Sequence, residues 1–238
     1  GDHQHGTDDD SRVGPQRAVQ SGAISPVAMK RAMWACGGLA LASGSALILV
    51  ALGTTIAPFA FLLLGLVAIA AAVKYTFGRN PYGYAGMGDL SVLLFFGLAG
   101  VCGTYYLHTT TWDPTVLLPA MGIGLLATGV LNLNNLRDIH GDAANGKRTV
   151  VVRIGPKAAK RYHAGLVYGG FACLVLFTAL HFRGWWQYAF LLTFVLLDRH
   201  VRTVQRTAEP RDLDPQLKVL ALTTLVTALL FSLGLIPG

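Results

Sequence analysis

Seven long apolar segments limit what this chain can fold into more than any other feature of its sequence. They cover roughly residues 30–52, 57–76, 89–110, 114–135, 159–181, 185–200 and 216–236. A helix needs about 20 apolar residues to cross the hydrocarbon core of a bilayer. All but one of the segments come close to this length, and the short 185–200 segment is expected to extend further. The sequence therefore predicts an all-α fold, a polytopic bundle of transmembrane helices with seven spans.

Charged residues are sparse in this chain of 238 residues. Only 13% are Asp, Glu, Lys or Arg, which is about half the charged fraction of an ordinary soluble domain. This composition excludes a disordered chain, a coiled coil and a soluble nucleic-acid-binding protein, although the formal net charge is +7. The three cysteines lie inside apolar segments and have the spacing of neither a metal site nor a disulfide framework.

The loops between the apolar segments alternate between long and short. Residues 1–29, 77–88, 136–158 and 201–215 form the long polar loops, and residues 53–56, 111–113 and 182–184 form the short ones. Of the 19 Lys and Arg residues, all except Arg183 lie on the long-loop side. Cytoplasmic loops carry such an excess of positive residues. We therefore expect the long loops to face the cytoplasm and, with seven spans, the C-terminus to lie outside.

Two acidic clusters lie on this long-loop side. The first contains Asp2, Asp8, Asp9 and Asp10, and the second contains Asp138 and Asp142 directly after a span. Asn134, Asp138 and Asp142 are spaced four residues apart, so they share one face if the helix continues. Carboxylate oxygens suit Mg²⁺, which commonly uses one or two of them together with substrate phosphates. Neighbouring Arg and Lys side chains suit the remaining phosphate oxygens.

Other interpretations of these clusters remain open at this point. Each cluster taken alone is also compatible with a solvated loop in which acids balance bases. His3 and His5 lie beside the first cluster, but zinc sites usually take closed sets of nitrogen and sulfur ligands, and no cysteine is near. Two acidic clusters on one side, each next to a span, favour a magnesium and phosphate site.

A third polar patch separates the second apolar segment from the third. Tyr75 and Arg79 are four residues apart near a predicted helix end. Interfacial tyrosines commonly belong to the aromatic belt of a membrane protein. Asp89 opens the following apolar segment, where an acid is favoured by the helix dipole.

Three sequence patterns carry a resemblance to a known family. Residues 134–155 read Asn-Asn-Leu-Arg-Asp-Ile-x-x-Asp-x-x-x-Gly-Lys-x-Thr-x-x-Val-Arg-x-Gly, and residues 81–97 read Pro-Tyr-Gly-Tyr-x-Gly-x-Gly-Asp-x-Ser-Val-x-x-Phe-Phe-Gly. The third is Arg-x-Gly-Pro-x-Arg over residues 12–17. Together they resemble UbiA-type intramembrane aromatic prenyltransferases, and within them the bacterial 1,4-dihydroxy-2-naphthoate polyprenyltransferases of menaquinone biosynthesis.

The resemblance covers essentially the whole chain and implies one membrane-embedded prenyltransferase domain over residues 1–238. The family has nine transmembrane helices, and its first aspartate motif runs Asn-Asp-x-x-Asp. This chain begins at the last two residues of that motif, Gly1 and Asp2. The seven spans are therefore expected to match helices three to nine of the family, and the first two helices of the family fold are not part of this sequence.

The resemblance also implies an activity. It is the Mg²⁺-dependent transfer of a polyprenyl group from polyprenyl diphosphate to 1,4-dihydroxy-2-naphthoate, with loss of CO₂, to give demethylmenaquinone. The implied location is the bacterial cytoplasmic membrane, with the active site on the cytoplasmic side. By residue-level matching, the implied Mg²⁺ ligands are Asp2, Asp8, Asp138 and Asp142; the diphosphate ligands are Arg12, Arg17, Asn135, Arg137 and Lys147; and the catalytic residues are Tyr75, Arg79 and Lys147.

Three alternative functions are compatible with parts of the sequence. Another aromatic acceptor, 4-hydroxybenzoate or homogentisate, is the nearest. A secondary transporter uses intramembrane acids as ion relays, but the acids here cluster at one interface and no internal repeat is evident. A membrane scaffold without chemistry leaves the paired clusters unexplained. The expected partners are the two substrates and the lipid bilayer, with no nucleic acid and no obligate protein partner.

Overall fold

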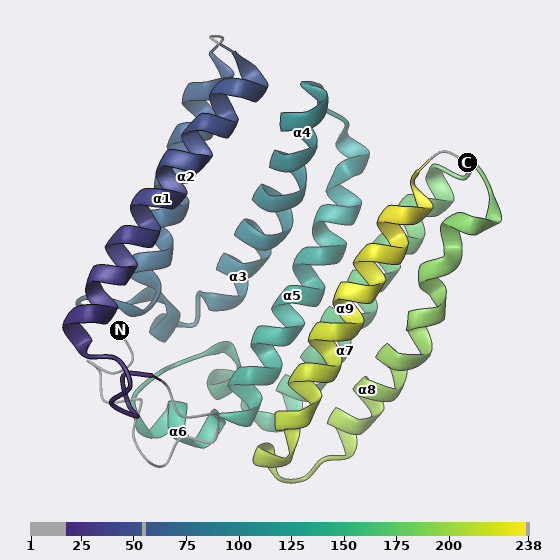
Figure 1. The fold of residues 1–238 in the computed structure, drawn as a ribbon. Coiled ribbons are helices and arrows are strands. Elements are labelled where there is room, and N and C mark those ends of the chain that lie inside the picture. The colour runs from purple at the N-terminus through teal and green to yellow at the C-terminus, as the bar shows by residue number, and fades with distance from the viewer. Residues whose placement is uncertain (1–17, 54–55, 237–238) are drawn as a thin grey trace.

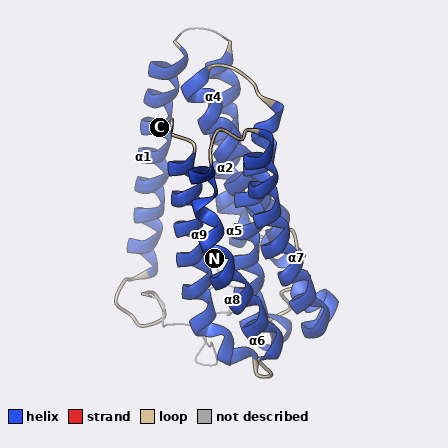
Figure 2. Ribbon diagram, turned by 90° about the vertical axis from the view of Figure 1, so that its right-hand side faces the viewer, coloured by secondary structure: helices blue, strands red, loops and turns tan. Residues whose placement is uncertain are grey.

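The computed structural model describes residues 18–53 and 56–236, and this part of the chain contains helices and no strand (Figures 1 and 2). The elements in chain order are α1 (Pro26–Leu52), α2 (Ala57–Thr76), η2 (Tyr82–Ala85), α3 (Gly88–Val92), η3 (Leu93–Cys102), α4 (Gly103–Thr109), η4 (Pro114–Val116), α5 (Leu117–Arg137), α6 (Ile139–Ala144), α7 (Val150–Leu180), η5 (Trp185–Thr193), α8 (Phe194–Arg206), η6 (Pro210–Leu213) and α9 (Asp214–Gly234).

Six helices within the described residues are long and apolar enough to cross a membrane. They are Pro26–Leu52, Ala57–Thr76, Gly88–Thr109, Pro114–Arg137, Val150–Leu180 and Pro210–Gly234. The α3, η3 and α4 elements together make the third of these. The predicted all-α membrane fold is confirmed, and the chain is an integral membrane protein.

The segment predicted to cross at residues 185–200 has a different local structure. Its first nine residues form the 3₁₀ helix η5, and it continues as α8 to Arg206. Helix α8 carries Asp198 and three arginines on a strongly amphipathic helix, so it lacks the uniform apolarity of the other six. Together η5 and α8 run alongside α7 and α9 (Figure 1). A seventh crossing stays a prediction.

Helix α5 lies at the centre of the bundle. It packs against α7, against the α3–η3 segment and against α9. Gly97 of η3 shows how close the approach is, because a Cβ there would lie 2.6 Å from the backbone oxygen of Ala120. Glycine thus lets the two backbones meet, as small residues do in membrane helix packing.

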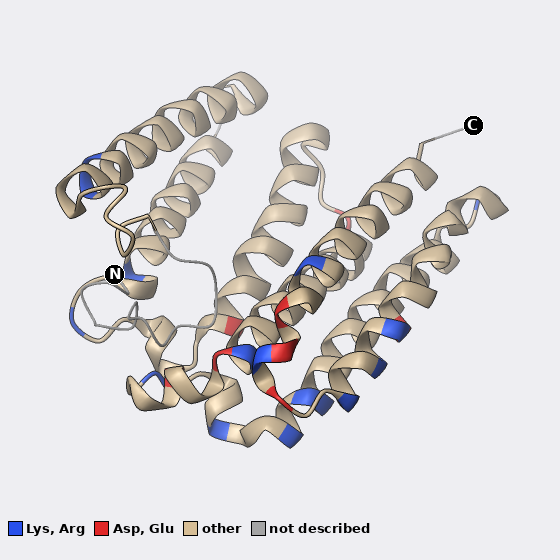
Figure 3. Cartoon of the chain, turned by 60° about the horizontal axis from the view of Figure 1, so that its bottom comes forward, with Lys and Arg blue, Asp and Glu red and all other residues tan. Residues whose placement is uncertain are grey.

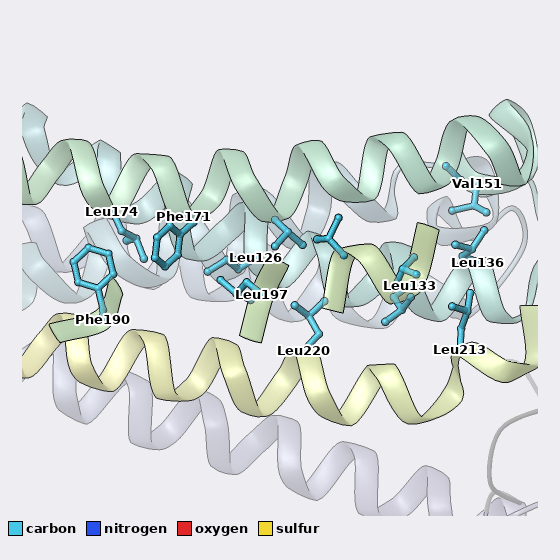
Figure 4. Packing of buried hydrophobic residues seen from close by; sticks show 14 of the residues in the cluster. Leu126, Leu133, Leu136, Val151, Phe171, Leu174, Phe190, Leu197, Leu213 and Leu220 are labelled. Carbon is cyan, nitrogen blue, oxygen red and sulfur yellow. The ribbon is translucent and has the colours of Figure 1, made fainter. Parts of the chain in front are cut away.

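The core lies between α5, α7, η5, α8 and α9 (Figure 4). Leu126, Leu133 and Leu136 line one side of α5, and each is fully or almost fully buried. They meet side chains from the other helices, which include Phe171, Leu174, Phe190, Leu197 and Leu220. This buried cluster packs around α5 and thereby positions its end.

Helices α1 and α2 form an antiparallel pair beside the rest of the bundle (Figure 1). Most of their apolar side chains are exposed, including Trp34 and Phe59. Of the most apolar 18-residue stretch in each helix, only 6% is buried in α2, against 56% in the Pro114–Arg137 span that contains α5. Their outward surface therefore suits contact with lipid.

Charged residues gather at one end of the bundle, around α6 and the nearby helix ends (Figure 3). This end holds the loops that the sequence analysis assigned to the long-loop side. Helix α9 ends at the opposite end of the bundle from α6 (Figure 1).

Candidate functional site

The second acidic cluster lies at the junction between α5 and α6. Helix α5 ends at Arg137, and α6 begins at Ile139 in a new direction, across the end of the bundle (Figure 1). Asp138 lies between them with φ −94° and ψ 8°. Its backbone N–H still donates to the Asn134 oxygen at 3.1 Å, and that of Asp142 donates to the Asp138 oxygen at 2.9 Å. The cluster stays compact, but it does not form one face of a continuous helix.

Arg137 is the most strongly bonded side chain of this cluster. Its Nε and Nη2 atoms donate to the two carboxylate oxygens of Asp138, both at 2.8 Å. Nη1 donates to Asp214 at the start of α9 at 2.6 Å, and Nη2 also donates to Asn134 at 2.9 Å. Only 4% of the Arg137 side chain is exposed. Its guanidinium is thus turned towards protein carboxylates and supports Asp138, and a direct bond from Arg137 to diphosphate stays a prediction.

Asp142 and Lys147 form the other ion pair of the site. Lys147 Nζ lies 3.2 Å from Asp142 Oδ1, and the Lys147 backbone N–H donates to the Asp142 backbone oxygen at 2.8 Å. The same ammonium group lies 5.8 Å from the ring centroid of Tyr84. The Lys147 and Asp142 side chains are mostly buried, with 19% of Lys147 and 10% of Asp142 exposed. Lys147, a predicted diphosphate ligand, is therefore held beside Asp142, a predicted metal ligand.

The loop after α6 is joined to the η2 turn, although the two lie far apart in the sequence. The Arg148 N–H donates to the Tyr84 oxygen at 2.9 Å, and Arg153 Nη2 donates to the Ala85 oxygen at 2.6 Å. Gly86 makes this contact possible. It has φ +76°, and a Cβ there would lie 2.8 Å from the Arg148 oxygen.

Tyr75 reaches the same region from the last turn of α2. Its ring meets the Tyr82 ring edge to face, with centroids 5.4 Å apart. A Cβ on Gly88 would lie 3.0 Å from the Tyr75 hydroxyl, so the start of α3 lies directly against it.

Arg79 is placed differently from the prediction. Helix α2 ends at Thr76, so Arg79 is not one helical turn after Tyr75. Gly78 and Asn80 on either side of it have positive φ values of 84° and 54° and turn the chain. The Arg79 side chain is exposed, while its backbone oxygen accepts a bond from Lys74. Tyr75 and Arg79 therefore do not share one helix face, and their catalytic roles stay predictions.

The remaining predicted residues divide into two groups. Asn135 is buried on α5, with 4% exposed. Asp2, Asp8, Arg12 and Arg17 lie outside the described residues.

The donor chemistry of the site fits Mg²⁺ bound together with a phosphate group. Asp138 and Asp142 supply hard oxygen donors, and Mg²⁺ typically takes one or two carboxylates and fills its remaining positions with water and phosphate oxygens. Across residues 18–53 and 56–236, no three His, Cys, Asp or Glu side chains are grouped as a closed metal cage. The chemistry of Asp138 and Asp142 thus fits a metal–diphosphate complex.

Sequence reasoning missed two acids of this region. Asp214 completes the bonds of Arg137, and Asp89 is buried in the first turn of α3. In the sequence, both lie at the start of an apolar segment, Asp89 as a single acid and Asp214 two residues after Asp212. That position is typical of an acid favoured by a helix dipole, so nothing local distinguished them.

Comparison with known proteins decides the family. The model of the UbiA prenyltransferase family matches residues 5–220. The chain belongs to this family. Members of the UbiA family generally depend on Mg²⁺, in agreement with the carboxylates at the end of α5.

Several UbiA relatives share a name. The chain is 46% identical over 235 residues to the 1,4-dihydroxy-2-naphthoate octaprenyltransferase of Escherichia coli, with 99% of this chain and 76% of the relative covered. The enzyme of the same name from Haemophilus influenzae is 45% identical over 238 residues, covering 100% and 77%. That of Mycobacterium tuberculosis is 38% identical over 225 residues, covering 94% and 73%. No solved structure matches the chain.

Proposed function

We propose that this UbiA prenyltransferase transfers a polyprenyl group from polyprenyl diphosphate to 1,4-dihydroxy-2-naphthoate. The acceptor loses its carboxylate as CO₂, and the product is demethylmenaquinone. The observation that carries the proposal is 46% identity, over 99% of this chain, to an enzyme named for this acceptor. The paired acids and bases at the end of α5 supply the chemistry that such a reaction needs.

The main electrostatic task of the site is to stabilise the leaving group. Breaking the allylic C–O bond develops negative charge on the diphosphate. Bound Mg²⁺ supplies Lewis-acid stabilisation of that charge. Asp138 and Asp142, with Asp2 and Asp8, are the proposed carboxylate donors. Lys147, with Arg12, Arg17 and Asn135, is proposed to hold the diphosphate oxygens.

The supporting contacts keep these donors in place before substrate binds. Arg137 fixes both oxygens of Asp138, and Asp142 holds Lys147 at 3.2 Å. A site whose charged groups are already oriented stabilises a developing charge without reorganising during the reaction.

The membrane setting protects the reactive intermediate. An allylic carbocation reacts with water, so a dry site favours transfer to the aromatic ring. Tyr75, at the membrane side of η2, is proposed to lie near the reacting carbon, and the prenyl chain is proposed to lie among the apolar helices.

The orientation in the membrane follows from the charge asymmetry. We propose that the end carrying α6 faces the cytoplasm of a bacterial cell, with the site at the inner face of the cytoplasmic membrane. The C-terminus then lies outside. The excess of Lys and Arg at that end supports this orientation.

One experiment tests both the acceptor and the metal. Membranes containing the full-length protein are incubated with Mg²⁺, a labelled polyprenyl diphosphate and each acceptor in turn. We expect labelled product with 1,4-dihydroxy-2-naphthoate and none after chelation of Mg²⁺. Product with 4-hydroxybenzoate or homogentisate but not with the naphthoate would reject the acceptor, and product without Mg²⁺ would reject the metal mechanism.

A further inference from the structure

Asp89 is a buried acid that the proposed chemistry has not yet used. It lies in the first turn of α3, and only 7% of it is exposed. The hydroxyl of Tyr162 on α7 lies close enough to interact with its carboxylate. Its other oxygen, Oδ2, has no hydrogen-bond partner among residues 18–53 and 56–236. A dipole-stabilising acid is normally solvated, so this position needs another explanation.

A second buried polar side chain lies on the neighbouring face of α5. Asn132 is completely buried, and within the described residues neither its Nδ2 nor its Oδ1 atom has a hydrogen-bond partner. It lies one helical turn after Thr128, whose hydroxyl is 3.5 Å from the Asp89 backbone oxygen. It also continues the row of α5 residues Ala120 and Gly124 that contacts η3. Asn132 therefore lies on the side of α5 that packs against α3 and η3, the segment that carries Asp89.

Unpartnered polar atoms in such a place require an explanation. Buried polar groups are nearly always hydrogen-bonded in native proteins, and the exceptions concentrate at functional positions. In a membrane protein, a buried ionisable residue is in addition a candidate functional residue by default. Asp89 and Asn132 together leave one acceptor oxygen and a complete carboxamide without partners in the described chain.

The position of these two residues joins them to the proposed site. Gly88 lies immediately before Asp89, and a Cβ on Gly88 would lie 3.0 Å from the Tyr75 hydroxyl. Asn132 precedes Asp138 by six residues on the same helix, a distance of about 9 Å along the axis. The two side chains therefore lie on the membrane side of the acids proposed to bind the metal.

The chemistry of the cluster suits a hydroxyl-bearing aromatic ring. A carboxylate oxygen accepts a bond from a phenolic O–H, and a carboxamide both donates and accepts. Diphosphate does not suit this position, because its charge repels that of Asp89. The same repulsion directs the acceptor's own carboxylate away from Asp89.

We propose that Asp89, Asn132 and Tyr162 form the acceptor subsite, an inference that rests on the proposed function. Asp89 accepts a hydrogen bond from a ring hydroxyl of the acceptor, and Asn132 bonds a second polar group of the same molecule. Tyr162 holds the Asp89 carboxylate in place. A hydroxyl bonded to a carboxylate gives the ring more electron density, which assists its attack on the allylic carbon.

Equilibrium binding without diphosphate tests the subsite apart from turnover. Purified full-length protein is titrated with 1,4-dihydroxy-2-naphthoate, 1-hydroxy-2-naphthoate and 2-naphthoate. For the wild type we expect affinity to fall at least about tenfold when the ring hydroxyls are removed. For Asp89→Asn, affinity for the dihydroxy compound should fall by a similar factor, and the difference among the three compounds should largely disappear. Unchanged discrimination in Asp89→Asn would overturn the subsite.

Asn132→Leu separates a binding role from a structural one. Leucine has a similar size and removes two unpartnered polar atoms, so the thermal unfolding temperature should stay the same or rise while acceptor affinity falls. A lower unfolding temperature with unchanged affinity would overturn the assignment of Asn132. Asp113→Asn, at the other end of the bundle, serves as the matched control and should change neither quantity.

Turnover distinguishes failure of the subsite from failure of the proposed function. If the wild type neither binds nor prenylates the dihydroxynaphthoate, both proposals fall. If the wild type prenylates it and Asp89→Asn has the same KM for the acceptor, only the subsite falls. The subsite stands if the acceptor KM rises while the KM for polyprenyl diphosphate stays unchanged.

Discussion

At the residue scale, the site depends on which charges are paired. Asp138 is bound through both oxygens by Arg137, and Arg137 is bound in turn by Asp214. Removing one member of a buried pair leaves the other charge uncompensated. Replacing Asp138 or Asp142, the proposed metal ligands, should therefore have a different effect on the reaction rate from replacing Asp214, which binds Arg137.

Asp138→Asn and Asp142→Asn should each abolish prenyl transfer without unfolding the protein. Each change removes a negative charge that Mg²⁺ requires, so the rate should fall about 100-fold or more, even at saturating Mg²⁺. Product formation and thermal unfolding are measured in parallel, with the exposed Glu209→Gln as control. Wild-type turnover by either variant would exclude that acid from the metal site.

Asp214→Asn should lower the apparent affinity for Mg²⁺ clearly and the stability of the fold only slightly. Asp214 is half exposed, so the free energy of unfolding should fall by only about 1 kcal/mol. Asp138 loses part of its support, and the rate at a fixed Mg²⁺ concentration should fall about tenfold. Titration with Mg²⁺ measures this, and Asp212→Asn is the neighbouring exposed control. An unchanged Mg²⁺ midpoint would show that Asp214 is structural only.

At the element scale, the helix bounds were largely predictable, and the breaks were not. The spans at residues 57–76 and 89–110 match α2 and the α3–α4 segment closely, since hydropathy is a local property of the chain. The end of α5 at Arg137 lies within two residues of the predicted end at 135, but the new direction of α6 and the positive φ of Gly155 inside α7 were not predicted. Nothing in the apolar pattern marks a change of helix direction.

The contact between η3 and α5 should tolerate no side chain at Gly97. A Cβ would lie 2.6 Å from the Ala120 oxygen and 2.7 Å from the Gly124 Cα atom, and both are backbone atoms that cannot turn aside. Gly97→Ala should therefore destabilise the protein by about 1–3 kcal/mol, measured by thermal unfolding in detergent. Gly38→Ala in α1, with open space around it, is the control, and equal stability of the two variants would contradict the close contact.

At the scale of the whole molecule, charge asymmetry predicts the topology. If η5 and α8 together cross the membrane, the 182–184 turn and residue 209 lie on opposite sides. Arg183→Cys should then react with a membrane-impermeant thiol reagent in intact cells, while Glu209→Cys should react only after permeabilisation. Labelling of both positions from the same side would show that this segment does not cross.

The sequence by itself determined the all-α membrane fold, most span bounds, the charge asymmetry and the second acidic motif with Lys147. These follow from apolarity, charge and short spacings, which act along the chain whatever lies beside it. Only the tertiary structure decided that Arg137 binds Asp214 across 77 residues, that Arg79 leaves the helix of Tyr75, and that Asp89 is buried against Tyr162. Such partners depend on how helices pack and which faces they turn inward, and single acids at helix starts carry no local sign of the side chain they will meet.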